Sequence, residues 1–232
     1  MATSTPHVIH SHRVLVFDVE TNGLLPKFGA NELKNYPYIL QLSFVIYDVG
    51  TQEILQEFDS YIDIDDSVPI SNKITELTGI KRPMCKKGVT IIEVIKKFQQ
   101  AYAMCNGGLV AHNIDFDTKM ISVEIERNRP IIEIHCPEVF SVFNPLYEKI
   151  HNIDRYCTMK SGTNLCNIMM PSRFASKPAT PKWPRLIELH NHLFKNEPIN
   201  GLHNSLIDVK VCLRCYLKML YNIDTKSFLE KT

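Results

Sequence analysis

The chain has 232 residues, of which 44% are hydrophobic and 22% are charged, and its formal net charge is +1. These values are ordinary for a soluble globular protein, and the length allows one large α/β domain or two small ones. No apolar run approaches the length of a membrane span, and the N-terminal sequence MATSTPHVIHSH lacks the regions of a signal peptide. These absences argue against a membrane or secreted protein and predict an intracellular one.

The seven cysteines are odd in number and irregularly spaced, which argues against a disulfide framework and favours a reducing compartment. The single CxxC pair, Cys212 and Cys215, falls on one face of a predicted helix. We interpret these thiols as core packing rather than as a zinc site. Residues 1–12, with three histidines, are expected to be a flexible tail without a metal-binding role.

The first predicted strand, Arg13 to Val19, is apolar on both faces, as in a central strand that is covered on both sides. Side chains alternate along a strand, so Asp18 and Glu20 share one face. Two neighbouring acids repel each other unless a positive partner such as a metal ion lies between them. An isolated D-x-E is more often a pair of solvated residues before a turn, so the metal interpretation requires further acids elsewhere.

Residues 38–49 and 53–64 predict a β-hairpin, whose acidic and exposed-looking faces indicate a sheet edge away from any anionic ligand. Residues 71–80 predict a short helix that is capped by Ser71 and closed by Gly79. A longer helix is expected within 89–105. Its apolar stripe consists of Ile91, Ile95, Phe98 and Tyr102.

The stretch LVAHNIDFDTKMISVEIER passes from a short strand into a helix that ends near Arg127. Residues 129–181, rich in Pro and Asn, predict a long irregular region with one strand-like segment near 155–159. Two helices, at about 182–195 and 204–222, complete the domain. Because the chain shows no repeat or linker, we expect a single domain over residues 13–222, followed by a C-terminal tail at 223–232.

Charge is segregated along the chain. Residues 35–72 contain seven acids and no Lys or Arg, whereas residues 155–185 contain six basic residues and no acid. Aromatic residues lie among those basic positions, a combination that suits a phosphate backbone with stackable bases. The expected basic loop at 159–181 and its neighbours offer Lys177, Lys182 and Arg185 as substrate contacts. A solvated loop is the alternative interpretation.

Further candidate acids follow in the second half of the chain. Asp115 lies where a strand gives way to a helix, and we interpret it as the helix N-cap, while Asp117 could project toward the strand ends. His203 precedes the last helix, and Asp208 follows it by five residues. Each residue taken singly could be structural, but the four acids and the histidine together indicate a site.

The motifs FDVETNG, AHNxxFD and HxxxxD occur in the order and spacing of the DEDDh 3′-to-5′ exonucleases, which the chain resembles over about residues 13–218. This family includes polymerase proofreading subunits, freestanding DNA repair exonucleases and oligoribonucleases. The phrases ITELTGI and CTM are also similar to family segments. The resemblance implies an α/β, RNase H-like fold with a mixed, mostly five-stranded sheet flanked by helices.

The resemblance further implies that Asp18, Glu20, Asp117 and Asp208 hold two divalent cations, Mg²⁺ or Mn²⁺, and that His203 is the general base. It implies a hydrolase that releases nucleoside monophosphates from a 3′ end. Two cations about 3.5 to 4 Å apart can stabilise the attacking and the leaving oxygen of a phosphodiester hydrolysis, and Mg²⁺ prefers oxygen ligands.

The segment that receives the 3′ end in the family matches Thr21, Asn22, Gly23 and Leu24, with Leu24 packing on the terminal base. His112 and Asn113 match as well, although bonds to local backbone would equally explain them. The insert PKFGANELKNYPY and the 159–181 loop favour a freestanding enzyme on single-stranded or frayed DNA. The alternatives are an exoribonuclease and a non-catalytic nucleic-acid-binding protein. A homodimer or a polymerase partner stays open.

Overall fold

The computed structural model describes residues 12–26, 32–170 and 179–229. Its main sheet has five strands in the order β3-β2-β1-β4-β5. The central strand β1 runs antiparallel to β2 and parallel to β4, which confirms the predicted mixed sheet. The strands are β1 Arg13–Thr21, β2 Ile39–Asp48, β3 Glu53–Tyr61, β4 Gly108–Ala111 and β5 Arg155–Cys157.

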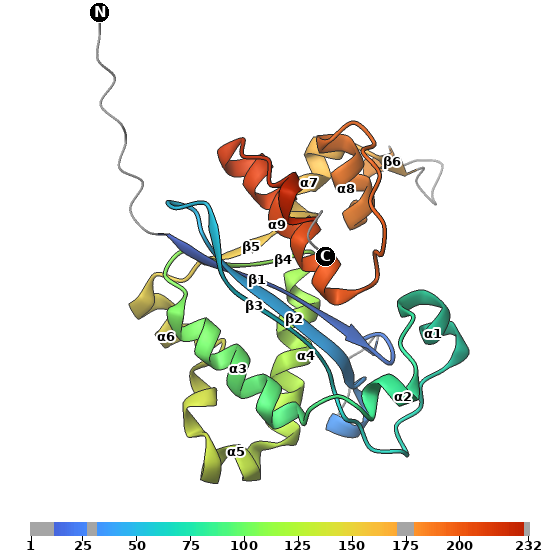
Figure 1. Ribbon diagram of the computed structural model, residues 1–232, viewed down its shortest axis with the longest axis vertical. Coiled ribbons are helices and arrows are strands. Elements are labelled where there is room, and N and C mark those ends of the chain that lie inside the picture. The colour runs from blue at the N-terminus through green and yellow to red at the C-terminus, as the bar shows by residue number, and fades with distance from the viewer. Residues whose placement is uncertain (1–11, 27–31, 171–178, 230–232) are drawn as a thin grey trace, which may run out of the picture.

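Helices cover both faces of this sheet (Figure 1). They are α1 Asn72–Thr78, α2 Arg82–Cys85, α3 Ile91–Met104, α4 Ile114–Arg127, α5 Arg129–His135, α6 Pro145–His151, α7 Thr158–Cys166, α8 Leu186–Leu193 and α9 Ser205–Tyr221. Short 3-10 helices lie at Leu33–Asn35, Pro137–Ser141 and Lys226–Phe228. Among these described helices, none combines the length and the apolar character that a membrane span requires.

Alternation along β1 divides the core into two parts. Leu15, Phe17 and Val19 pack in the cluster that includes the apolar residues of α3 and α4. Val14 and Val16 point to the opposite face, where they pack against α9. Asp18 and Glu20 continue this second row and therefore lie on the face that α9 covers.

Several local predictions are confirmed. The Ser71 side chain accepts a hydrogen bond from the N–H of Ile74, and Gly79 ends α1 with a φ of 74°. The predicted apolar stripe of α3 faces the core. Cys212 and Cys215 are buried in apolar clusters, as expected of packing residues.

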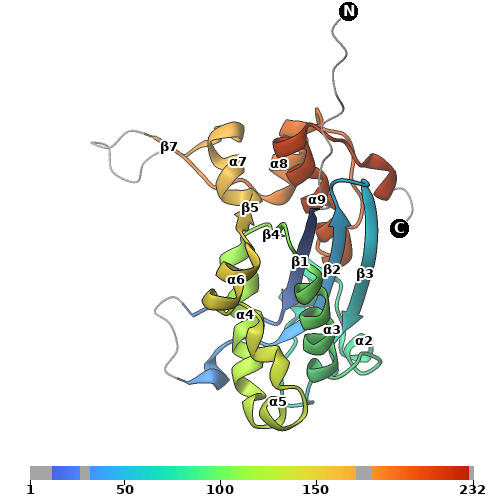
Figure 2. The same cartoon turned by 90° about the vertical axis from the view of Figure 1, so that its left-hand side faces the viewer.

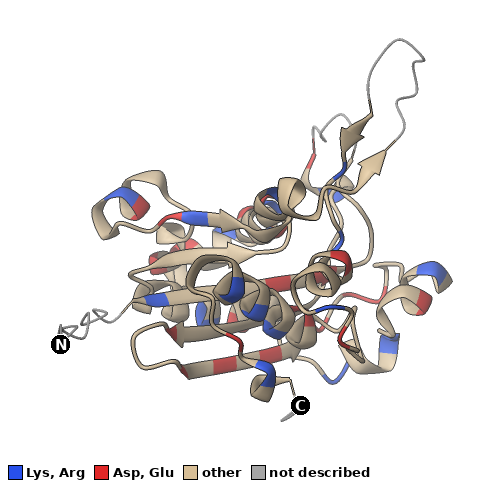
Figure 3. Cartoon of the chain, turned by 90° about the horizontal axis from the view of Figure 1, so that it is seen from above, with Lys and Arg blue, Asp and Glu red and all other residues tan. Residues whose placement is uncertain are grey.

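The prediction that both hairpin strands are exposed at an edge is wrong for β2. Every residue of β2 is buried, because β1 and β3 flank this strand and helices cover both of its faces. Of the two hairpin strands, only β3 lies at an edge of the sheet, and exposed residues alternate along it. Figure 3 shows acidic positions along the strands of the sheet.

Residues 129–181 are more helical than predicted, since α5, α6 and α7 all lie within them. Pro130 and Pro145 fall in the first turns of α5 and α6, where a missing N–H costs nothing, so these prolines begin helices rather than break them. The expected basic loop is likewise partly wrong, because α7 extends to Cys166. Beyond it, β6 Met169–Met170 and β7 Thr180–Pro181 pair as a small hairpin that extends from the body (Figure 2). Residues 171–178 lie outside the described part of the chain.

The C-terminal segment from residue 223 is folded rather than a tail, at least as far as residue 229. The Phe228 ring lies 5.9 Å from the ring of Tyr47, centroid to centroid, and the Asp224 carboxylate pairs with the buried guanidinium of Arg214 at 2.7 Å. The predicted flexible tail at 1–12 falls almost entirely on residues that the structure does not describe.

Candidate active site

Asp18 and Glu20 are part of β1, which continues to Thr21 and so is two residues longer than predicted. Opposite them on β2 are Ser43 and Gln41. On its other side, β1 pairs with β4 only from Val14 to Val16. The edge of β1 beside the two acids is therefore open, and the helix that follows β4 can reach it.

Asp117 occupies this open edge. Its Oδ1 accepts a hydrogen bond from the N–H of Val19 at 3.2 Å, a position where a parallel strand would otherwise supply the acceptor. The side chain is 2% exposed. Asp117 thus lies beside the two acids of β1, as the sequence predicted.

The prediction that Asp115 caps this helix is wrong. The N-cap is Asn113, which takes a left-handed conformation with a φ of 79° and turns the chain into α4 two residues earlier. Asp115 is instead exposed in the first turn, with its carboxylate 2.5 Å from the Lys160 ammonium. Asn113 shapes this turn through its backbone and makes no side-chain cap bond, and its contact with substrate stays a prediction.

His203 and Asp208 reach the acids of β1 from the beginning of α9. The backbone N–H of His203 donates to Oδ2 of Asp208 at 3.1 Å. One ligand atom from each of Glu20, His203 and Asp208 lies within 4.8 Å of the other two. His203 has a φ of 68°, a left-handed conformation that is uncommon outside glycine and that occurs at functional turns.

Ser205 joins the two halves of the cluster, and motif reasoning did not identify it. Its hydroxyl donates to the carbonyl oxygen of Asp18 at 2.8 Å, and its N–H donates to Oε1 of Gln41 at 3.5 Å. Gln41 is completely buried and donates in turn to Asp59 at 2.8 Å. The signal for this network was the presence of two polar residues, Gln41 and Ser43, within the apolar run from Ile39 to Ile46.

Burial raises the pKa of every acid in the cluster, and repulsion between the acids adds to this effect for Glu20, Asp117 and Asp208. Burial raises the pKa of Asp18 to about 6, an effect that a hydrogen bond from Ser205 opposes. Burial, together with the charges of Asp18 and Asp208, raises the pKa of Glu20 to about 9. The pKa of Asp208 rises to about 8 and that of Asp117 lies well above its ordinary range, for the same two reasons.

These carboxylates fit divalent cations. The Oδ2 atom of Asp18 is buried and has no hydrogen-bond partner among the described residues. All four acids offer oxygen ligands, which Mg²⁺ and Mn²⁺ prefer, and a cation would offset the repulsion between their charges. The residues that would hold such ions are Asp18, Glu20, Asp117 and Asp208, with His203 at the rim.

Of the residues predicted to receive a 3′ end, two use their side chains within the protein. The Thr21 hydroxyl donates to the carbonyl oxygen of Gly23 at 2.6 Å. The Asn22 amide accepts from the N–H of Tyr38 at 2.7 Å and donates to the carbonyl oxygen of Pro69 at 3.0 Å. Leu24 contrasts with both, since 86% of its surface is exposed.

His112 links distant segments rather than local backbone. One ring nitrogen lies 2.9 Å from the Thr158 hydroxyl, and the other lies 3.0 Å from the carbonyl oxygen of Pro184. Burial lowers the pKa of His112 to about 4, so the ring is neutral near neutral pH. This histidine therefore joins the β4–α4 turn to the starts of α7 and α8.

Two of the basic residues predicted to contact substrate form ion pairs within the protein, and the third lies outside the described residues. Lys182 pairs with Glu188 at 2.7 Å, and Arg185 pairs with the same carboxylate at 3.2 Å. Lys177 falls within 171–178 and is not described. Any contact of Lys182 with a phosphate would have to compete with Glu188.

A mixed sheet in this order, flanked by helices, is the RNase H-like fold. A family model described as "Exonuclease", of the RNase T type, matches residues 15–216. The chain belongs to this exonuclease family, and the predicted relationship to the DEDDh 3′-to-5′ exonucleases is confirmed.

Among curated relatives, the chain is 29% identical over 145 residues to a DNA polymerase III of PolC type from Caldanaerobacter subterraneus subsp. tengcongensis. That match covers 60% of this chain but only 9% of the polymerase. The chain therefore spans less than a tenth of that relative's length.

Two solved structures share the fold. The nuclease domain of 3′hExo, a DEDDh family member bound to rAMP, superposes with a TM-score of 0.59 at 16% identity, covering 92% of this chain and 94% of that one. E. coli Exonuclease I in complex with a dT13 oligonucleotide superposes with a TM-score of 0.59 at 15% identity, covering 89% and 41%.

Proposed function

We propose that the chain is a metal-dependent 3′-to-5′ exonuclease that releases nucleoside monophosphates from single-stranded or frayed DNA ends. The observation that carries this proposal is the convergence of Glu20, His203 and Asp208, whose ligand atoms lie within 4.8 Å of one another, beside the buried Oδ2 of Asp18 and the buried Asp117. A non-catalytic protein that had only kept the fold would have no chemical reason to retain all five groups together.

The residues divide the chemistry between them. Two divalent cations, when bound to the four acids, would neutralise charge at the scissile phosphate and at both reacting oxygens. His203 lies at the exposed rim of the cluster, where its ring can take a proton from the attacking water. Its backbone bond to Asp208 holds the histidine beside the acids. Leu24, exposed beyond the end of β1, can pack against the terminal base.

The proposal also specifies the sugar of the substrate, deoxyribose rather than ribose. The polymerase relative acts on DNA by its name, and the Exonuclease I structure contains a deoxynucleotide oligomer. The 3′hExo structure instead contains a ribonucleotide, which favours an exoribonuclease as the second candidate. A contact with the 2′-hydroxyl of the substrate is the interaction that would distinguish the two.

The test compares end-labelled single-stranded DNA, duplex DNA and single-stranded RNA, each with Mg²⁺, Mn²⁺ or chelator. We expect stepwise shortening of single-stranded DNA from the 3′ end, release of nucleoside 5′-monophosphates, and complete loss of activity with chelator. Asp208→Asn is the matched control for a contaminating nuclease, because it removes a proposed ligand while retaining the side-chain shape. Degradation that persists in chelator, or that the control variant retains, would refute the proposal.

A further inference from the structure

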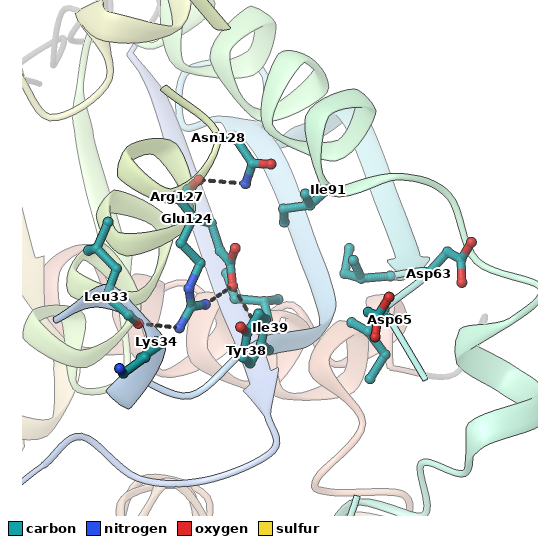
Figure 4. A pocket seen from close by; sticks show the side chains of 12 residues that line it. Leu33, Lys34, Tyr38, Ile39, Asp63, Asp65, Ile91, Glu124, Arg127 and Asn128 are labelled. Atoms are coloured by element: carbon teal, nitrogen blue, oxygen red, sulfur yellow. Dashed lines mark hydrogen bonds and ion pairs between the residues drawn. The ribbon is translucent and has the colours of Figure 1, made fainter. Parts of the chain in front are cut away.

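Helix α4 carries a second polar group that faces the interior, at the end opposite to Asp117. Arg127, its last residue, extends into a cavity of about 460 Å³ that is lined by parts of β2, α3 and α4 (Figure 4). Its side chain is only 10% exposed. Both of its terminal nitrogens are hydrogen-bonded, which matters because an unpaired buried charge is strongly destabilising, while its Nε has no hydrogen-bond partner among the described residues.

The partners of Arg127 are mainly backbone carbonyls of one segment, residues 33–38, which we call the anchored segment. Nη1 donates to the carbonyl of Pro37 at 2.9 Å, and Nη2 donates to the carbonyls of Leu33 and Tyr36 at 2.9 and 2.6 Å. The guanidinium also lies 3.8 Å from the centre of the Tyr38 ring. This planar fork therefore fixes the path of the main chain over the whole segment.

Glu124 completes the arrangement. Its Oε1 lies 2.5 Å from Nη1 of Arg127 and accepts the N–H of Ile39 at 3.4 Å. The carboxylate is itself buried, so the two charges offset each other within the protein. The pair thus belongs to the anchor and leaves little charge for a ligand in the cavity.

The anchored segment in turn holds the chain that follows the first acidic motif. Asn22 and Tyr38 form two hydrogen bonds, from Asn22 N–H to the Tyr38 carbonyl at 3.1 Å and from Tyr38 N–H to Asn22 Oδ1 at 2.7 Å. Asn22 lies midway in sequence between Glu20, in the acidic cluster, and Leu24, which is 86% exposed. A continuous set of contacts therefore runs from Arg127 through Tyr38 and Asn22 toward Leu24.

We propose that Arg127 is a positioning residue for substrate: it fixes, through the anchored segment, the place of Leu24 relative to the acids, and so sets the affinity for the terminal nucleotide. This inference rests on the proposed function. Its physical basis is that one rigid helix carries both Asp117 and Arg127, which are ten residues or about 15 Å apart along the axis. The acid and the loop that would hold the base are thereby placed by the same element.

The substitution that tests this role is Arg127→Lys, which retains the charge beside Glu124 but cannot reproduce the fork to three carbonyls. Arg129→Lys is the matched control, because Arg129 pairs with Glu126 and Glu133 at the surface and contacts no residue of the anchored segment. We expect Arg127→Lys to raise KM for a single-stranded oligonucleotide about tenfold while kcat changes little, as for a lost binding interaction remote from the chemistry. The control should leave both unchanged.

A double-mutant cycle with Leu24→Ala separates positioning from general stabilisation. The readout is the Kd of a labelled single-stranded oligonucleotide, measured by fluorescence anisotropy in chelator, so that no hydrolysis is needed. If Arg127 acts through Leu24, Arg127→Lys should weaken binding in the wild-type background but add little to Leu24→Ala. Equal effects in both backgrounds would overturn the inference.

Asn22→Ala provides a second route should Arg127→Lys fold poorly. It removes the side-chain bond to Tyr38 and leaves the Arg127–Glu124 pair intact, so it should reproduce both the weaker binding and the non-additivity with Leu24→Ala. Unchanged binding by this variant would also overturn the inference. A wild-type chain that binds oligonucleotide but does not hydrolyse it with Mg²⁺ or Mn²⁺ would refute the proposed function alone, whereas a chain that binds none with or without these cations would refute both.

Discussion

Without divalent cations, the protein should lose stability as the pH rises from about 7 to about 8. Glu20, with its pKa raised to about 9, and Asp208, with its pKa raised to about 8, keep protons in the folded state that they have already released in the unfolded chain. A group whose pKa is raised by folding favours the folded state while it is protonated, and this contribution decreases as the pH rises toward the folded pKa. Each such proton corresponds to a slope of about −1.4 kcal/mol per pH unit, so one to two protons predict a loss of roughly 1 to 3 kcal/mol over this unit.

The pH window is chosen so that groups outside the acidic cluster contribute little, whereas Asp117, whose pKa burial also raises well above its ordinary range, adds to the same loss. His112 and His190 have pKa values lowered to about 4 by burial, so they are neutral when folded, and above about pH 7 they are also largely neutral in the unfolded chain. Asp18, at about 6, is mostly ionised in both states. Above about pH 8 the unfolded thiols begin to ionise, which sets the upper limit.

The assay is urea unfolding across this window, in chelator and in saturating Mg²⁺. Cations bind the deprotonated carboxylates, so Mg²⁺ should flatten or reverse the slope, and Glu20→Gln should reduce it in chelator. A stability in chelator that is constant or rises with pH would refute the account of the acids as a repelling, partly protonated cluster.

Three further outcomes follow from the site. Asp117→Asn should abolish nucleotide release yet unfold at an equal or higher urea concentration, because it removes a buried charge and keeps an acceptor for the Val19 N–H. Asp115→Asn should retain activity, and its free energy of unfolding should fall by about 1 kcal/mol or less. His203→Ala should lower kcat roughly 10² to 10⁴-fold in single-turnover assays while oligonucleotide binding persists; near-normal turnover would exclude it as the base. Ser205→Ala should weaken Mn²⁺ binding about 10 to 100-fold by calorimetry, because supporting hydrogen bonds orient metal ligands. An unchanged Mn²⁺ affinity would show that Ser205 only packs.

Local patterns predicted the elements best where one physical signal dominates. The apolar run from Arg13 to Val19 identified the central strand, and Ser71 and Gly79 marked both ends of a helix. Errors arose where a residue type has two opposite uses. Proline breaks a helix in its interior but is favoured in its first turn, as at Pro145. An aspartate that follows a strand resembles an N-cap, but before Asp115 the chain has already been turned into the helix by the left-handed Asn113.

The assembly of the site could not be derived from local pattern, because its residues meet only through tertiary structure. The resemblance to a family selected Asp117 over Asp115, and the hydrogen bond to Val19 gives the physical reason: only Asp117 reaches the edge that β4 leaves open. Ser205 and Arg127 escaped prediction for the same reason, since their partners lie far away in sequence. The role assigned to the Asn22 side chain also changed once its bond to Tyr38 was visible.

The residues of the site are far apart in sequence, and this separation determines when during synthesis and folding the site can form. The bond from Val19 to Asp117 spans 98 residues, and that from Ser205 to Asp18 spans 187. Closing such long loops costs conformational entropy, and only the packing of the completed core offsets this cost. The cation-binding cluster therefore cannot form on an early fragment. During synthesis, a ribosome must release α9 before Asp208 can meet the acids of β1. Partly made or partly unfolded chains therefore lack an assembled nuclease centre, and the hazard of uncontrolled nucleic-acid degradation is confined to the folded molecule.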